Sequence, residues 1–312
     1  MSAEVKSDSG RMCSHGSDIA KEVDEITAKV DDIKLKECSE SNSDDECPKE
    51  ESPKEVIEGA STKTEIIEVT DDILFKQPES SHLGDCPICI IPLPLDISKS
   101  KATACCSKII CIGCNFANQK SEYERKFKLD PKCPFCREPI PKSEKQRSWN
   151  KRKRREANDP YALRDHGARC LQKKDYKVAF QYLSKAADLG DVTAHYYLSI
   201  MYQLGHVKED EKKQLSHLEQ AAIGGHPSAR YNLGNHEWVN KRHERALRHY
   251  MIAARQGDDD TIKFLMEAFK RGNINKGGLA AALRAHQAAV DETKSPQRAE
   301  AEAAMKRFGG DF

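Results

Sequence analysis

The cysteines of this 312-residue chain gather in one short stretch. Eight of the twelve lie between residues 86 and 136, and they form four pairs: Cys86 and Cys89, Cys105 and Cys106, Cys111 and Cys114, Cys133 and Cys136. Thiolates at this spacing suit zinc, which takes four such ligands in structural sites that leave no coordination position open. The eight thiolates therefore predict two closed zinc sites.

The sequence favours metal ligation over disulfide bonds for these cysteines. The N-terminus reads MSAEVKSDSG, without the apolar stretch of a secretory signal, and no run approaches the ~18 apolar residues that a membrane span needs. We therefore expect an intracellular protein of the nucleus or cytoplasm, where thiols stay reduced and clustered cysteines bind metal.

The order and gaps of the cysteines resemble the RING family, in which alternate ligand pairs share a zinc ion. The resemblance implies one site of Cys86, Cys89, Cys111 and Cys114 and another of Cys105, Cys106, Cys133 and Cys136. One position departs from the common pattern, because Lys108 stands where most RING domains have a histidine ligand. The adjacent pair Cys105-Cys106 is closer to the all-cysteine variant. A PHD-like finger or zinc ribbon is the alternative.

Three other residues of this region match RING positions that serve ubiquitin transfer. Ile88 and Pro134 lie where RING ligases contact the ubiquitin-conjugating enzyme, and Arg137 matches the residue that bridges this enzyme and ubiquitin. The resemblance thus implies a ubiquitin ligase with two Zn²⁺ ions, with the conjugating enzyme and ubiquitin as partners. A non-catalytic scaffold, in which these side chains only pack locally or face solvent, is the alternative.

From residue 158 onward the sequence repeats. The segments 186–190, 221–225 and 253–257 each begin with Ala-Ala and end in Gly, at spacings of 35 and 32 residues, and other alanines keep the same offsets. This period predicts stacked helix hairpins, with each glycine ending a helix. The pattern resembles Sel1-like repeats, relatives of the TPR family, with Ser199 in place of a glycine. It implies binding of an unknown protein substrate; a spacer or dimerisation role is the alternative.

Charge divides the first half of the chain. Residues 1–80 hold 22 acidic and 10 basic residues with a single aromatic, Phe75, and this composition predicts disorder. Within them the run Ile66-Ile67-Glu68-Val69, with Glu65, Asp71 and Asp72 around it, resembles a SUMO-interacting motif, which implies SUMO as a further partner. A chance apolar run in an acidic tail is the alternative.

Residues 81–156, in contrast, carry a net charge of +9. The run 151–155 matches a nuclear import signal, a nucleic-acid contact or a solvated linker. We expect neither nucleic acid nor a membrane as the main partner.

These observations predict a mainly α-helical protein with a small zinc-stabilised module. The expected parts are a disordered acidic tail at 1–80, a cross-brace RING at 81–142, a basic linker at 143–157 and an α-solenoid of Sel1-like hairpins at 158–305.

Overall fold

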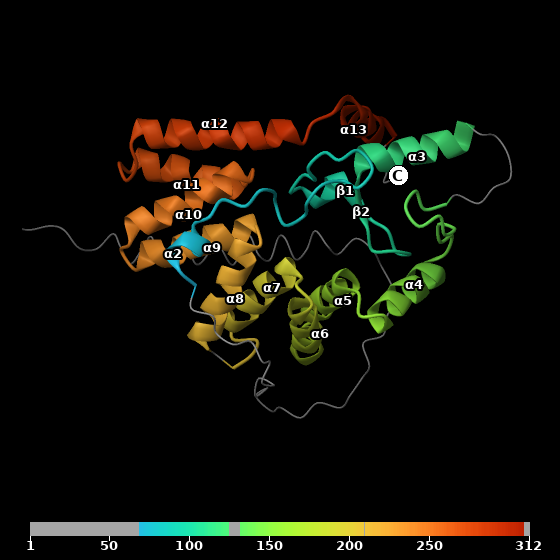
Figure 1. Cartoon of the computed structure of the whole chain (residues 1–312), viewed down its shortest axis with the longest axis horizontal. Helices are drawn as coiled ribbons and strands as arrows, with labels where there is room; N and C mark the ends of the chain where they lie inside the picture. The colour runs from blue at the N-terminus through green and yellow to red at the C-terminus, as the bar shows by residue number, and fades with distance from the viewer. Residues whose placement is uncertain (1–68, 125–131, 209, 309–312) are drawn as a thin grey trace, which may run out of the picture.

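The computed structural model describes residues 69–124, 132–208 and 210–308, and this part of the chain is mainly α-helical (Figure 1). None of the helices within these ranges is long and apolar enough to cross a membrane. From residue 144 onward the helices are α4 (Glu144–Glu156), α5 (Pro160–Gln172), α6 (Tyr176–Asp188), α7 (Val192–Gln203), α8 (Glu211–Ile223), α9 (Pro227–Val239), α10 (His243–Arg255), α11 (Asp259–Lys270), α12 (Lys276–Glu292) and α13 (Pro296–Phe308).

Helices α5 to α10 form three antiparallel hairpins that stack in chain order, as Figure 1 shows. The alanines at the repeated positions let neighbouring helices approach closely, and each is at most 5% exposed: Ala162, Ala186, Ala187, Ala194, Ala221, Ala222, Ala229, Ala253 and Ala254. The predicted solenoid of helix hairpins is confirmed.

The glycine that ends each hairpin takes the backbone conformation that the sequence predicted. Gly190, Gly225 and Gly257 have φ angles of +86°, +85° and +85°, in the left-handed region that suits glycine at a helix C-terminus. The next helix begins at once. Asp191 and Asp258 accept a hydrogen bond from the backbone N–H of its third residue, at 2.8 and 2.9 Å.

Two hairpins also use a small residue inside their first helix. A Cβ atom added at Gly167 would lie 2.8 Å from the Leu183 side chain, and one at Gly234 would lie 2.4 Å from the Tyr250 ring. The middle hairpin has Ser199 at this position, where its buried hydroxyl donates to a carbonyl of its own helix at 2.7 Å. The glycines thus allow the two helices of a hairpin to touch.

The cysteine module has little regular structure besides one helix. The 3-10 turn η1 (Ile97–Lys99) leads into strand β1 (Ser100–Ala102), which pairs antiparallel with β2 (Ile109–Cys111). Helix α3 (Ile112–Glu124) follows directly. Besides cysteines, the fully buried apolar residues of this small core are Leu93 and Ile110. A core this small is typical of modules that a metal ion stabilises.

The predicted basic linker is helical. Ser143 caps α4 by accepting a hydrogen bond from the N–H of Gln146 at 3.3 Å. Helix α4 is then tied to the start of the repeats, because Arg154 pairs with Asp159. Part of the basic run therefore has a structural role.

The predicted disordered tail also differs from the structure near its end. Residues 1–68 lie outside the described part of the chain, whereas residues 69–80 are described. They include the short helix α2 (Asp71–Leu74), in which Leu74 is buried against the repeats. The acidic segment therefore includes a part that packs on α8.

The last helix leaves the repeat stack and returns to the cysteine module (Figure 1). A Cβ atom on Gly113 of α3 would lie 2.9 Å from the backbone nitrogen of Arg298 in α13. The ion pair between Lys120 and Glu300, at 3.0 Å, adds to this contact. The segment predicted as one repeat domain, 158–305, thus ends in a helix that covers the cysteine module.

Candidate functional site

The eight clustered cysteines come together in two groups of four. One contains Cys86, Cys89, Cys111 and Cys114, the other contains Cys105, Cys106, Cys133 and Cys136, and the sulfur atoms within each group all lie within 4.8 Å of one another. These are the two interleaved sets that the RING resemblance implied. Because the two groups alternate along the chain, each group joins cysteine pairs on both sides of a pair that belongs to the other group.

The sulfur positions fit a tetrahedral metal ion. Zn–S bonds of ~2.3 Å place the sulfurs of a regular tetrahedron about 3.8 Å apart. Three Sγ–Sγ distances lie near that value: 3.8 Å for Cys89–Cys111, 3.9 Å for Cys106–Cys133 and 3.4 Å for Cys105–Cys136. Four thiolates at these separations can hold one Zn²⁺ with no position left for a substrate.

Two pairs of cysteines lie on the same kind of backbone turn. The N–H of Ile90 donates to the carbonyl of Cys86 at 2.8 Å, and the N–H of Arg137 donates to the carbonyl of Cys133 at 3.0 Å. Both donors are left-handed, with φ angles of 54° and 61°. The turn points the two sulfurs of a pair in one direction, and it holds the backbone of Arg137 at the module surface.

A third copy of this turn explains the adjacent cysteines. The N–H of Ser107, whose φ is 57°, donates to the carbonyl of Thr103 at 2.9 Å. Thr103 thus stands where the other turns have their first cysteine, and its hydroxyl lies 3.1 Å from the sulfur of Cys106. Cys106 takes the second position of the turn, and Cys105 supplies the missing ligand.

Lys108, the residue that departs from the common RING pattern, is not a ligand in this arrangement. Its backbone carbonyl closes the turn by accepting from the N–H of Thr103 at 2.9 Å. Its ammonium group lies 5.7 Å from the centre of the Phe135 ring, a cation–π distance. The second group is therefore complete without it.

The protonation of the first group depends on contacts among its own cysteines and on burial. A hydrogen bond with Cys111 lowers the pKa of Cys86 to about 4, and the same hydrogen bond raises the pKa of Cys111. Burial raises the pKa of Cys114 to about 12. Four negative charges cannot share so small a volume, so binding of a metal ion must release the remaining protons.

Arg298 from α13 supplies a positive charge beside the first group. It is 5% exposed, and its guanidinium donates to the carbonyls of Ile91 and Pro92 at 3.0 and 2.7 Å. One of its nitrogens lies 3.6 Å from the sulfur of Cys89. Four thiolates around Zn²⁺ leave two negative charges, and a buried guanidinium at this distance offsets part of them. The donor set and its surroundings thus fit zinc.

The three residues matched to ubiquitin transfer are all accessible. Ile88 is 42% exposed, and Pro134 and Arg137 are also exposed. Ile88 lies on the turn that serves the first cysteine group, whereas Pro134 and Arg137 lie on the turn that serves the second. Their surface positions leave them available for contacts with another protein.

The SUMO-like motif lies mostly outside the described residues. Ile66, Ile67 and Glu68 fall there, so the motif stays a prediction. Val69 is partly buried against the repeats, and Asp71 accepts a hydrogen bond from Arg245 at 2.6 Å. The described end of the motif is therefore engaged within the chain.

Sequence reasoning missed Thr103, Arg298 and the docking of residues 69–82. The turn around Thr103 has a weak signal, since a threonine three residues before Cys106 repeats the spacing of the cysteine pairs. Arg298 lies in an ordinary charged helix far along the chain from the cysteines. No local pattern identifies it.

Comparison with known proteins supports the repeats. The family model of the Sel1 repeat matches three consecutive segments, 163–191, 192–226 and 227–258. These segments are the hairpins α5/α6, α7/α8 and α9/α10, so this part of the chain consists of Sel1 repeats. No curated protein and no solved structure matches the chain. The RING resemblance stays a prediction.

Proposed function

We propose that this protein is a RING-type ubiquitin ligase, in which the cysteine module docks a ubiquitin-conjugating enzyme and the Sel1 repeats bind a protein partner. The observation that carries the proposal is the pair of interleaved cysteine groups, with sulfur separations that suit zinc. Both groups are filled by thiolates alone, so the metal ions would be structural. Structural zinc is worth roughly 10–16 kcal/mol of folding free energy in small zinc-finger peptides.

The exposed turns of the module would contact the conjugating enzyme and ubiquitin. Ile88 and Pro134 offer apolar contacts to the conjugating enzyme, which carries ubiquitin as a thioester. Metal-bound cysteines are not available as nucleophiles, so the module itself forms no covalent bond to ubiquitin. Arg137 has a planar guanidinium with several donors, which suits it to hold two proteins at once. Catalysis would then consist of orienting the thioester for attack.

The Sel1 repeats would bring the substrate or a scaffold. Stacked hairpins give an extended surface, and such repeats generally bind other proteins. This role is compatible with both the ligase and the scaffold hypotheses, and it does not distinguish them.

Ubiquitin discharge tests the proposal. The full-length, zinc-loaded protein is incubated with a panel of ubiquitin-loaded conjugating enzymes, and the loss of thioester is followed with and without free lysine. We expect faster discharge from at least one enzyme and loss of this effect in Cys86→Ser and Cys133→Ser. If the protein carries two zinc ions and accelerates no discharge, the scaffold hypothesis replaces the ligase.

A further inference from the structure

Residues 69–82 lie across the repeats like a bound peptide; we refer to them as the docked segment. The segment runs over α8, α9 and α10 before it enters the cysteine module (Figure 1). Its one helix, α2, has four residues, and a single helical turn is not stable in isolated chain. The repeats therefore determine the shape of the segment.

Two neighbouring side chains anchor the docked segment. Leu74 is 4% exposed and packs in the apolar cluster between hairpins that also contains Leu218 of α8. Phe75 lies with its ring centre 4.5 Å from that of His249, and the guanidinium of Arg248 lies 3.7 Å above the ring. An aliphatic and an aromatic residue in sequence thus occupy an apolar site and a basic site side by side.

The backbone of the segment is also recognised. Arg230 of α9 has no exposed surface, and its guanidinium donates to the carbonyls of Leu74 and, at 3.4 Å, Lys76. Burial lowers the pKa of Arg230 to about 10. A buried guanidinium that donates to peptide carbonyls suits a peptide-binding site, because it binds the backbone of a peptide independently of the peptide's side chains.

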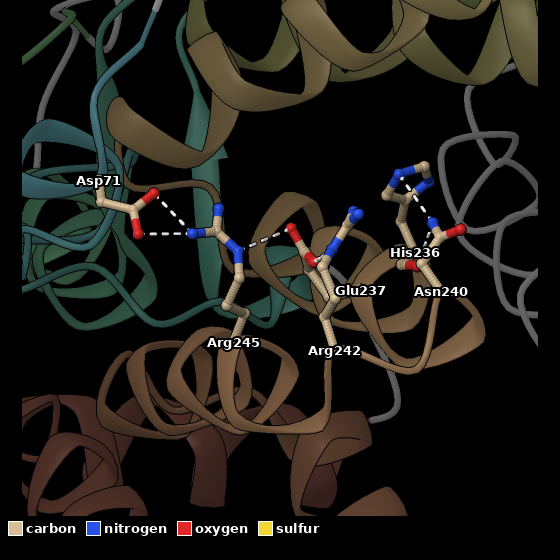
Figure 2. A network of polar contacts seen from close by, with 6 residues as sticks. All are labelled: Asp71, His236, Glu237, Asn240, Arg242 and Arg245. Atoms are coloured by element: carbon tan, nitrogen blue, oxygen red, sulfur yellow. Dashed lines mark hydrogen bonds and ion pairs between the residues drawn. The ribbon is translucent and has the colours of Figure 1, made fainter.

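An acidic residue completes the contact one turn before Leu74. Figure 2 shows Arg245 between Asp71 of the segment and Glu237 of α9. The nitrogen Nε of Arg245 donates to Glu237 at 3.2 Å, and Nη1 donates to Asp71 at 2.6 Å. Glu237 is 6% exposed and also pairs with Arg242.

This arrangement makes the site ready for a ligand. Glu237 of the repeats holds the Nε side of the Arg245 guanidinium, so the Nη1 nitrogen keeps its direction whether or not Asp71 is present. The side chains that bind the segment are thus already ordered, and they would lose little conformational entropy when they bind another peptide. Ile73, which lies between Asp71 and Leu74, is 51% exposed, so only some side chains of the segment take part in the docking.

From these contacts we propose that the surface of α8, α9 and α10 is a binding site for a linear peptide with an acidic residue three positions before a leucine-aromatic pair. The docked segment fills this site in the free protein, through Asp71, Leu74 and Phe75. A partner protein that carries the same acidic-x-x-Leu-aromatic chemistry displaces it. The inference specifies the partner-binding role proposed for the repeats, and it does not depend on ubiquitin transfer.

The test uses the full-length chain and a fluorescent peptide of residues 68–78. In the double variant Leu74→Asp, Phe75→Ala the site is open, so we expect micromolar peptide binding by fluorescence anisotropy. The wild-type chain should bind at least tenfold more weakly, because a tethered segment competes at an effective concentration in the millimolar range. Adding Arg230→Met to the open variant should abolish binding, and a peptide with the two substitutions should not bind.

Two results would overturn the proposal. An open variant with wild-type helix content that fails to bind the peptide shows that the surface is no peptide site. Equal binding by the open variant and the wild type shows that the segment does not fill the site.

Hydrogen exchange on the wild-type chain gives an answer even if the open variant does not fold. Excess unlabelled peptide should speed exchange of the Leu74 amide, which is bonded to the carbonyl of Thr70 at 2.9 Å. A scrambled peptide serves as the control. Unchanged exchange at saturating peptide means that the segment is not displaced, and the proposal fails.

Discussion

Substitution of Ile88 by alanine tests the docking of a conjugating enzyme with a magnitude that follows from the structure. Full burial of an isoleucine side chain is worth ~1.5–3 kcal/mol. Ile88 is 42% exposed, so a partner can bury only the remaining two-fifths. The contact is then worth roughly 0.6–1.3 kcal/mol, and its loss should weaken binding about three- to eightfold.

The assay is a titration of the full-length, zinc-loaded protein with the conjugating enzyme that it activates. Ile97→Ala is the matched control, because Ile97 is 48% exposed and lies in η1, outside the two contact turns. The control should bind like the wild type. The metal content of all three proteins should be two ions, since neither residue is a ligand.

Arg137→Ala separates docking from activation. Alanine keeps the Cβ atom, so the strain of the left-handed turn does not change, and enzyme binding should stay within twofold of the wild type. Discharge should slow by tenfold or more, because the partner groups of Arg137 meet only in the loaded complex. The reasoning is refuted if Ile88→Ala and Ile97→Ala weaken binding equally, or if Arg137→Ala discharges ubiquitin at the wild-type rate.

Three further predictions concern metal, packing and pH. Arg298→Met removes the charge beside the first cysteine group, so a chelator should extract one of two zinc ions faster, whereas unchanged extraction would contradict the role of this arginine. Gly234→Ala places a methyl group against a buried ring and should lower the free energy of unfolding, measured in urea, by ~1–3 kcal/mol. Gly278→Ala in α12, where the added Cβ atom would make an ordinary contact at 3.5 Å, should raise it by up to about 1 kcal/mol. A change of the same sign in both variants would refute the packing argument. Burial lowers the pKa of His217 to about 4 and of His249 to about 3. Below pH ~6.5 the unfolded chain therefore binds protons that the folded chain does not. The free energy of unfolding should fall by roughly 1.4 kcal/mol per pH unit for each histidine as the pH drops toward 4. The variant His249→Phe keeps the ring packing and should reduce that slope; an equal slope would show that His249 does not contribute.

The repeats were predictable because their signal is local and repeated. An Ala-Ala pair before a glycine describes one helix end, and three copies at one offset describe a stack. The spacing of the cysteines predicted four pairs of metal ligands, and the RING resemblance implied which pairs share an ion. In both cases a few residue types at fixed positions determine the geometry.

The contacts between distant parts of the chain were not predictable in this way. The docked segment is one helical turn, too short for periodicity, and its partner Arg230 lies 156 residues from Leu74. Composition alone assigned it to a disordered tail. Arg298 and Cys89 lie 209 residues apart. A burial that depends on such partners leaves no local pattern in the sequence.

Three contacts fasten the cysteine module to the repeats. Helix α4 joins it to α5, helix α13 covers α3, and the docked segment lies on α8 to α10. Release of the docked segment removes one attachment and leaves the contact of α13 with α3 and the pair Arg154–Asp159. A partner peptide can therefore take the place of the segment while the module stays fixed to the stack. If the module docks a conjugating enzyme, the distance from that enzyme to the bound partner is then set by α4 and α13, and it does not change when the partner binds.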